Sequence, residues 1–152
     1  MTAPNIRPVK RSDRQQWQPL WDGYNTFYER VAAPEVTEAT WTRFFDHYEP
    51  VHAFVAEGDG GELVGLVHYI FHRNTFMVAP VTYLQDLFTS VEVRGQGVGR
   101  ALIEAVYAEA ERAGSPRVYW HTHESNAQAR MLYDKVAERS GFIQYRKAIP
   151  IR

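Results

Sequence analysis

Residues 94–100, with the sequence RGQGVGR, constrain this chain more than any other segment. They follow a strand-like run at residues 83–90 and open a helix-like run at residues 98–113. Glycines at alternate positions leave the backbone bare, so that its N–H groups can point at an anion. The positive end of the helix dipole reinforces the same spot. The pattern therefore predicts a strand, a turn that binds phosphate or pyrophosphate, and a helix in succession.

Composition sets the class of protein. The 152 residues suit one domain, residues 1–152, and the 45% apolar and 23% charged content is typical of a globular protein. The net charge of −1 disfavours a dedicated nucleic-acid binder. The sequence contains no cysteine, which excludes disulfides, thiolate metal sites and cysteine nucleophiles. With no apolar run long enough for a membrane and no signal-peptide pattern, we expect a cytoplasmic protein.

Periodicity predicts one mixed α/β domain in the order β-α-α-β-β-β-α-β-α-β. Strands are expected at residues 5–10, 51–57, 62–72, 81–90, 118–122 and 142–147. Ser12 is expected to cap the first helix, with Gln15 completing a capping box, and Pro34 to break it. Thr37 is expected to cap the second helix. Residues 125–128 form a further capping box before the last helix.

Three kinds of phosphate loop compete for the glycine segment. A P-loop needs Lys-Ser/Thr after the last glycine, but Arg100 and Ala101 stand there. A dinucleotide fingerprint needs G-x-G-x-x-G in a parallel βαβ unit, whereas this spacing is G-x-G-x-G, late in the chain. An ordinary glycine-rich turn is the plain alternative. The pattern Arg94-x-x-Gly97-x-Gly99 resembles the Arg/Gln-x-x-Gly-x-Gly/Ala loop of the GCN5-related N-acetyltransferases, which binds the pyrophosphate of acetyl-CoA.

The resemblance covers nearly the whole chain and is densest over residues 81–145. The segment YLQDLFT at residues 83–89 looks like the Tyr-Leu-Glu-Asp-Phe-Phe-Val strand of the diamine and polyamine acetyltransferases. Asn126, Tyr133 seven residues later, and a Gly-Phe pair at residues 141–142 complete the match. The resemblance implies the acetyltransferase fold, a central, mostly antiparallel, splayed sheet flanked by helices.

The resemblance also implies roles in binding acetyl-CoA. Main-chain groups of Leu87, Phe88 and Thr89 would pair with the pantetheine arm, and the Leu87 N–H would be the oxyanion donor. The pyrophosphate would be held by the loop residues Arg94, Gly95, Gln96, Gly97, Val98, Gly99 and Arg100. Asn126 would bond the pantetheine or nearby backbone, and Tyr133 would be the general acid. From position alone, Asn126 is equally a helix cap and Tyr133 a packing residue.

The general base is where this sequence departs from that family. Gln85 replaces the family's glutamate and cannot accept a proton. Asp86 points to the opposite face of the strand, where it acts as base, directly or through water, or is a structural or substrate-positioning carboxylate. Glu124, His121 and His123 are the other candidates. We predict no metal site, since the histidines have neither cysteines nor an H-E-x-x-H pattern beside them.

Aromatic residues on the first helix predict the acceptor site. Trp21, Tyr24 and Tyr28 share a stripe that mostly packs on the sheet, but the family's first helices wall the acceptor, and aromatic faces attract an amine cation. Gln85 and Glu124 are expected to contact the same substrate.

The sequence thus predicts an acetyl-CoA-dependent N-acetyltransferase. We expect a small primary amine, either a polyamine or an amino-acid-like compound, to attack the thioester directly in a ternary complex. A protein or peptide lysine acetyltransferase is the alternative within the enzymes. A non-catalytic acetyl-CoA-binding module is the alternative outside them, favoured by Gln85. Because Pro150 limits pairing at the end of the chain, an open sheet edge indicates a homodimer.

Overall fold

The computed structural model describes residues 3–151. Contacts within the chain divide it into two compact parts, Met1–His121 and Thr122–Arg152, and each is described by itself. The single domain expected over residues 1–152 stays a prediction.

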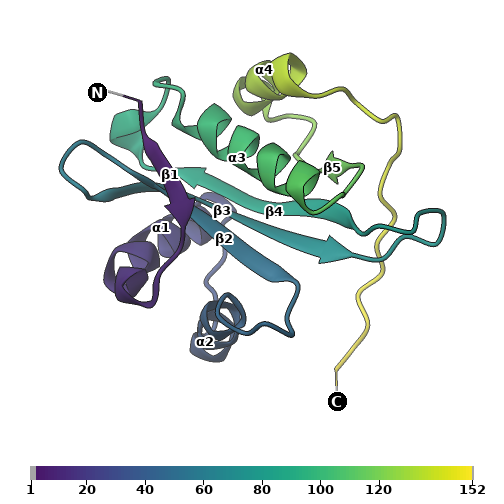
Figure 1. The fold of residues 1–152 in the computed structure, drawn as a ribbon, viewed down its shortest axis with the longest axis horizontal. Helices are drawn as coiled ribbons and strands as arrows, with labels where there is room; N and C mark the ends of the chain where they lie inside the picture. Colours follow the sequence, from purple (N-terminus) through teal and green to yellow (C-terminus); the bar gives the residue numbers. More distant parts are fainter. Residues whose placement is uncertain (1–2, 152) are drawn as a thin grey trace. The chain divides into compact units, whose positions relative to one another are not determined.

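The first part is built around a five-stranded sheet in the order β1-β2-β3-β4-β5 (Figure 1). Its strands are β1 (Asn5–Pro8), β2 (Val51–Glu57), β3 (Leu63–His72), β4 (Val81–Thr89) and β5 (Val118–Tyr119). Neighbouring strands are antiparallel except β4 and β5, which are parallel. The mixed, mostly antiparallel fold class is therefore confirmed.

Helices cover both faces of this sheet. The helices are α1 (Arg14–Phe27), α2 (Pro34–Arg43) and α3 (Val98–Arg112), with short 3₁₀ turns η1 (Arg11–Asp13) and η2 (Val91–Val93). Figure 1 shows α1 and α2 on one face and α3 on the other. Each helix buries apolar side chains, such as Trp17 of α1, Trp41 of α2 and Leu102 of α3, so the sheet lies between two packed layers.

The core on the α1 face is aromatic. Trp17 is fully buried and packs between Trp21 and Trp41, with ring centroids 5.6 and 4.9 Å away. The opposite face buries Leu102 and Val106 of α3 completely. Burial of one such side chain stabilises the fold by about 2 kcal/mol, so these two layers hold the sheet in place.

Both predicted N-caps of the first two helices are wrong. Ser12 lies inside the turn η1, where the Asp13 carboxylate accepts from the Lys10 N–H at 2.7 Å. The helix α1 begins directly after Asp13, whose side chain does not bond to that helix. The second helix begins at Pro34, the residue expected to break the first, because proline suits the first turn of a helix. Thr37 lies inside α2, where its hydroxyl accepts a hydrogen bond from the Trp21 indole at 2.9 Å.

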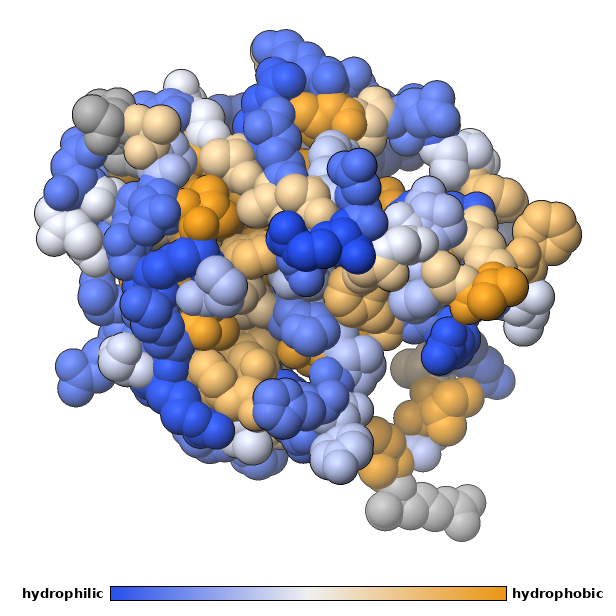
Figure 2. Space-filling model, viewed as in Figure 1, coloured by the Kyte–Doolittle hydropathy of each residue, from blue (hydrophilic) through white to orange (hydrophobic). Residues whose placement is uncertain are grey.

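The second part contains one helix, α4 (Ala127–Val136). Asn126 caps it, its side chain accepting from the Ala129 N–H, so the cap lies one residue beyond the predicted Ser125. The strand expected at residues 142–147 is wrong, since residues 137–151 form neither helix nor strand. Their large apolar side chains are exposed instead, and orange atoms stand at the surface at the lower right of Figure 2. The fifth predicted strand is also shorter, ending at Tyr119.

Helices long and apolar enough to cross a membrane are absent from residues 3–151.

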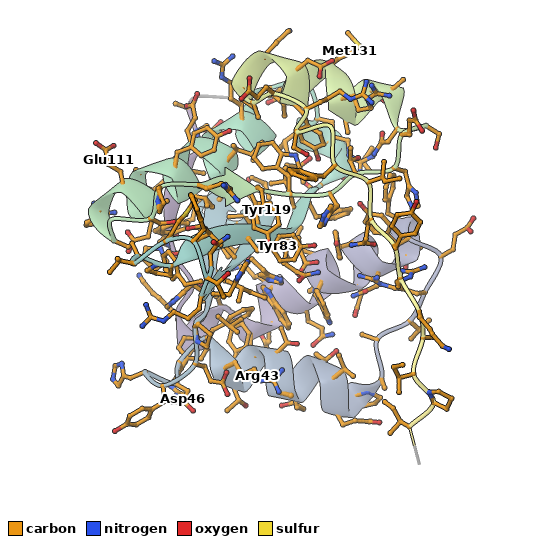
Figure 3. The ribbon with its side chains drawn as sticks, turned by 90° about the vertical axis from the view of Figure 1, so that its right-hand side faces the viewer. Arg43, Asp46, Tyr83, Glu111, Tyr119 and Met131 are labelled. Carbon is orange, nitrogen blue, oxygen red and sulfur yellow. The ribbon has the colours of Figure 1, made fainter. Side chains whose placement is uncertain are left out.

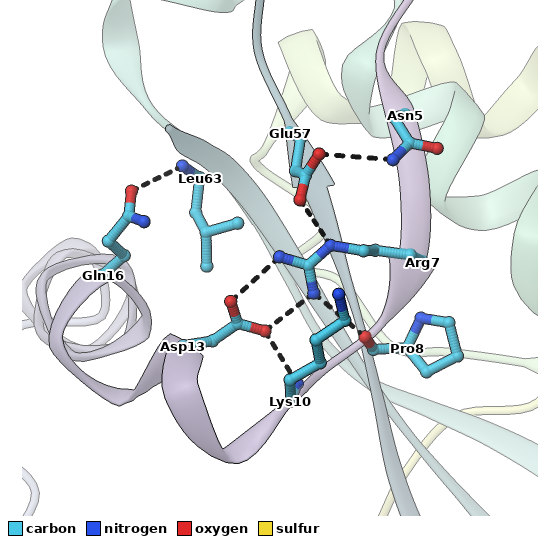
Figure 4. Close-up of polar contacts among 8 residues, drawn as sticks. All are labelled: Asn5, Arg7, Pro8, Lys10, Asp13, Gln16, Glu57 and Leu63. Carbon is cyan, nitrogen blue, oxygen red and sulfur yellow. Dashed lines mark hydrogen bonds and ion pairs between the residues drawn. The ribbon is translucent and has the colours of Figure 1, made fainter. Parts of the chain in front are cut away.

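A charged network ties the N-terminal strand to the start of α1 (Figure 4). The Arg7 guanidinium donates to both Asp13 oxygens at 2.8 and 2.9 Å, and to Glu57 at 2.5 Å. These bonds, with that from the Lys10 N–H, hold the pKa of the Asp13 carboxyl below its usual value. The carboxylate form is thus the one that fits the folded chain.

We expect Asp13→Asn to lower the free energy of unfolding by about 2–3 kcal/mol at neutral pH, since it leaves Arg7 and a backbone N–H poorly paired. A depressed pKa stabilises the fold above the ordinary carboxyl pKa, and this contribution disappears as the pH falls through the folded pKa. Urea titrations at neutral and acidic pH should therefore show the gap to the wild type closing in acid. Asp22→Asn, on the exposed side of α1, is the control and should change stability little. A difference in the free energy of unfolding that does not change with pH would contradict the lowered pKa of Asp13.

Candidate active site

One edge of β4 loses its neighbour halfway along the strand. β5 pairs with β4 at Thr82 opposite Val118 and at Tyr83 opposite Tyr119. From residue 84 to residue 89, no strand in the part of the chain that the structure describes lies against this edge. The main chain of residues 87–89 therefore presents an edge to which an extended ligand can add like a further strand.

A bulge in β4 accompanies this separation. His68 of β3 lies opposite Asp86, but the next residue, Tyr69, lies opposite Leu84. Gln85 is the extra residue, which bends the strand as β-bulges do. The prediction that Gln85 and Asp86 face opposite ways agrees with their burial, because Gln85 is exposed whereas Asp86 is 6% exposed.

The glycine loop between η2 and α3 leaves the first N–H groups of the helix without partners inside the helix. Gly95 and Gly97 have φ angles of 81° and 84°, which residues with a side chain rarely adopt. Gly97 is the N-cap of α3 and has no side chain that could cap the helix. The first helical hydrogen bond runs from Ala101 N–H to the Gly97 carbonyl at 3.0 Å, so the N–H groups before it have no partner within the helix. An exposed, uncapped helix N-terminus of this kind fits a pyrophosphate.

The two arginines of the loop differ in their contacts. Arg94 is exposed and lies over the Phe88 ring, 5.6 Å from its centroid. Arg100 is paired with Glu104 at 2.9 Å, one turn along the helix. Arg94 is therefore a loop cation that lies against a side chain of β4, whereas Arg100 is paired within its own helix.

A chain of hydrogen bonds runs from α1 through β3 to β4. The Trp17 indole donates to His68 Nε2 at 3.1 Å, and His68 Nδ1 lies 2.8 Å from Asp86 Oδ2. An indole N–H only donates, so Nε2 must be the unprotonated nitrogen. His68 is then a neutral imidazole whose Nδ1–H donates to the Asp86 carboxylate. This arrangement keeps a negative charge inside the protein without placing a positive one beside it.

Tyrosines gather around that carboxylate. Burial, the charge of Asp86 and a hydrogen bond with it raise the pKa of Tyr24 strongly. Burial and the same charge raise the pKa of Tyr28 and of Tyr83. All three hydroxyls stay protonated at neutral pH, so these tyrosines serve as hydrogen-bond donors and not as bases.

A second aromatic group lies where β4 and β5 separate. Tyr83 and Tyr119 stack with centroids 5.0 Å apart, and Figure 3 shows their side chains next to each other. The Tyr83 hydroxyl lies 3.2 Å from His121 Nδ1, and the Tyr119 hydroxyl lies 2.6 Å from His72 Nε2. Of these four residues, only His121 was a candidate from sequence. The others are brought together by strand pairing, which no local pattern reveals.

The predicted acceptor residues of α1 lie at different depths. Trp21 is buried in the aromatic core and donates to Thr37, which is a packing role. Tyr24 and Tyr28 flank the Phe88 side of β4, Tyr24 packing edge-on to Phe88 at 6.5 Å. Gly23 lies so close to Phe88 that a Cβ there would stand 2.8 Å from the ring. The structure thus brings Tyr24, Tyr28 and Asp86 together on one face.

The remaining predicted residues belong to the second part. Asn126 is the N-cap of α4, Tyr133 lies within that helix, and the Glu124 carbonyl accepts from the Arg130 guanidinium at 2.7 Å. Over residues 3–151, no three histidine, aspartate or glutamate side chains are grouped as a metal site requires. The roles expected for Asn126, Tyr133 and Glu124 stay predictions.

Comparison with known proteins identifies the family. The acetyltransferase (GNAT) family profile matches residues 17–137. This chain belongs to the GNAT acetyltransferase family. It is 35% identical over 143 residues to the D-amino-acid N-acetyltransferase HPA3 of Saccharomyces cerevisiae, covering 93% of this chain and 89% of that protein. The family assignment makes this chain an N-acetyltransferase, and the family uses acetyl-CoA. Membership of the polyamine branch, which the strand motif suggested, is not confirmed.

Solved structures share the fold at lower identity. The ribosomal-protein-alanine N-acetyltransferase of Brucella melitensis has a TM-score of 0.81 at 21% identity, covering 97% of this chain and all of that one. AAC(6')-Iy, solved with a bisubstrate analogue of CoA and acetylneamine, has a TM-score of 0.82 at 20% identity, with coverage of 97% and 100%. Both likenesses concern the fold alone.

The glycine loop gives a test with a built-in control. Gly97→Ala and Gly114→Ala both place a methyl group in open space at a positive φ, 84° and 73°, at opposite ends of α3. Both should cost about 1 kcal/mol of stability through backbone strain. We expect only Gly97→Ala to weaken acetyl-CoA binding, by about tenfold, measured by calorimetry. Equal affinities for the two variants would contradict an anion site at this loop.

The buried carboxylate gives a second test. Asp86→Asn leaves part of the buried chain unsatisfied, so we expect a loss of about 1–3 kcal/mol in the free energy of unfolding. Gln85→Glu, one residue away on the exposed bulge, should change it by less than about 0.5 kcal/mol. Denaturant titration of both variants checks this, and equal losses would show that Asp86 is not held as described.

Proposed function

We propose that this protein transfers the acetyl group of acetyl-CoA to the primary amine of a small molecule, and that amino-acid-like acceptors are favoured over polyamines. The proposal depends on the open N-terminus of α3. This terminus follows two glycines with left-handed φ angles, and it lies beside the edge of β4 that has no strand partner. The D-amino-acid acetyltransferase of yeast supports an amino-acid-like acceptor.

The parts of acetyl-CoA have matching groups on the first part of the chain. In this proposal the N–H groups of residues 95–100 and the Arg94 guanidinium hold the pyrophosphate. The main chain of Leu87, Phe88 and Thr89 pairs with the pantetheine arm. The Leu87 N–H then lies where the thioester oxygen develops negative charge, and stabilises it as an oxyanion donor.

The reaction proposed is a direct transfer in a ternary complex. The neutral amine nitrogen forms a bond to the thioester carbonyl carbon, the carbon–sulfur bond breaks, and the thiolate takes a proton from the Tyr133 hydroxyl. The proton lost by the amine leaves through a base or a water relay. The chain has no cysteine to form an acetyl-enzyme, in agreement with direct attack.

Asp86 serves the acceptor as a fixed negative charge in this scheme. It is buried and bonded to His68 and Tyr24, which hold it in place. Its charge attracts the ammonium form of the acceptor to the tyrosines before that group loses its proton and attacks. His121, exposed and bonded to Tyr83, remains a candidate base on the same strand ends, and Glu124 and His123 remain candidates from the second part.

The alternatives differ in what they predict. A lysine-peptide acetyltransferase would need an acceptor site that admits the peptide chain on both sides of the lysine. A binding module would hold acetyl-CoA without turnover, and Gln85 on the bulge is the feature that favours it.

The homodimer stays a prediction, for which the exposed apolar side chains of residues 142–151 are the supporting observation.

Thiol release from acetyl-CoA, measured against amino acids, polyamines and lysine peptides, tests the proposal. We expect turnover with amino acids and a fall of about 100-fold in kcat for Tyr133→Phe, which removes the proton donor. Tyr48→Phe, at a tyrosine that is 96% exposed, is the matched control. Tight binding of acetyl-CoA with no turnover on any amine would favour the binding module, and turnover on peptides alone would favour the lysine acetyltransferase.

A further inference from the structure

The C-terminus of α1 holds one arginine in an unusual way. After the helix ends at Phe27, Glu29 adopts a φ of 56°, in the left-handed region that normally favours glycine. The Glu29 N–H donates to the Thr26 carbonyl at 2.9 Å, and the Arg30 N–H donates to the Asn25 carbonyl at 3.0 Å. This pair of bonds is the Schellman motif, and it turns the chain so that Arg30 folds back along the helix.

The side chain of Arg30 is held as firmly as its backbone. Its Nε donates to Asn25 Oδ1 at 2.8 Å, and Asn25 is itself buried, with its amide nitrogen bonded to the Trp21 carbonyl at 2.9 Å. The guanidinium carbon lies 5.5 Å from the Tyr24 ring centroid and 5.4 Å from that of Tyr28. Arg30 is therefore fixed over the two tyrosines of the acceptor face.

This guanidinium keeps hydrogen-bonding capacity for a ligand. Within residues 3–151, no carboxylate forms an ion pair with Arg30, in contrast to Arg7, Arg14 and Arg100. The bond to Asn25 uses the Nε–H, which leaves the two terminal nitrogens of the guanidinium to face a ligand. Their geometry suits a carboxylate, which guanidinium groups bind through charge-assisted and often bidentate hydrogen bonds.

The acceptor face therefore carries charges of both signs. The negative charge of Asp86 raises the pKa of the Tyr24 and Tyr28 hydroxyls, and the positive charge of Arg30 lowers it. A buried anion and an exposed cation thus act on the same two side chains. A molecule that carries both an amine and a carboxylate complements such a pair, whereas a polyamine would meet repulsion from Arg30.

We infer that Arg30 binds the carboxylate of the acceptor and thereby selects amino acids over polyamines and simple amines. This inference rests on the proposed function and names the acceptor class of the same site. Arg30 acts on specificity and takes no part in the chemistry. A purely structural Arg30 would support the end of α1 and affect all acceptors alike.

Paired substrates separate these two roles. The substrates are D- and L-phenylalanine, phenethylamine, which lacks the carboxylate, and spermidine. Steady-state kinetics should show that the wild type prefers an amino acid. We expect Arg30→Gln to raise KM for the amino acid by about 10- to 100-fold, the size expected for one lost charge-assisted contact. Its KM for acetyl-CoA and its kcat/KM for phenethylamine should be unchanged. Arg30→Lys, which keeps the charge but loses the fork, should restore part of the preference.

Arg43→Gln, at an exposed arginine in the last turn of α2, is the matched control and should leave the ratio of amino acid to amine unchanged. If Arg30→Gln left the ratio of activity on the amino acid to activity on phenethylamine at its wild-type value, the inference would be overturned. An equal loss of activity on both acceptors would also overturn it, and in both cases the proposed function would stand. Absence of wild-type turnover with every amine would overturn the proposed function, and this inference with it.

Discussion

The buried hydrogen-bond chain from Trp17 through His68 to Asp86 is the interaction on which this structure depends. It joins α1 to the middle of β3, 51 residues further along the chain, and to the bulge of β4, a further 18 residues on. A buried carboxylate without partners would be costly, and a neutral histidine together with protonated tyrosines removes that cost. The same bonds fix the position of α1 against the sheet, so the charge and the helix that walls it are placed together.

The bulge and the strand separation then convert a packed sheet into a site. Up to Tyr83 the strand β4 is an ordinary member of the sheet, paired on both sides. Beyond it, Gln85 is extruded and the edge toward β5 is left without a strand partner. The glycine loop follows within a few residues, so an extended ligand with a terminal phosphate meets an open edge and then an anion site. The order of these features along one short stretch of chain explains why that stretch was so informative as sequence.

Local features could be predicted from sequence and non-local ones could not. The strand at residues 51–57, the helix that begins at Val98 and the glycine turn before it follow from periodicity and glycine spacing, and the structure has them there. The caps at Ser12 and Thr37 were wrong because Ser12 lies inside the turn η1 and the second helix already begins at Pro34, which suits its first turn. The strand at residues 142–147 has the right composition but pairs with nothing in the described chain.

In the site, the sequence pointed to Asp86 but not to the groups that surround it. His68 was read only as one of several histidines, because its partners Trp17 and Asp86 lie 51 and 18 residues away. Tyr83 and Tyr119 meet through a parallel pairing that depends on the whole crossover. Arg30 showed no pattern at all, since its orientation follows from the left-handed turn at Glu29, a residue type that gives no warning of it.

The contact between Gly23 and Phe88 has a consequence for how this enzyme can vary. Helix α1 approaches β4 at a point where even one additional carbon atom would overlap the phenylalanine ring. The spacing between helix and strand is thus set by a missing side chain, and the residue that follows Gly23 is Tyr24. Any larger residue at this position would push α1 away from β4 and move Tyr24 away from the open edge of that strand. The absence of a side chain at position 23 is therefore a condition for keeping Tyr24 close to β4.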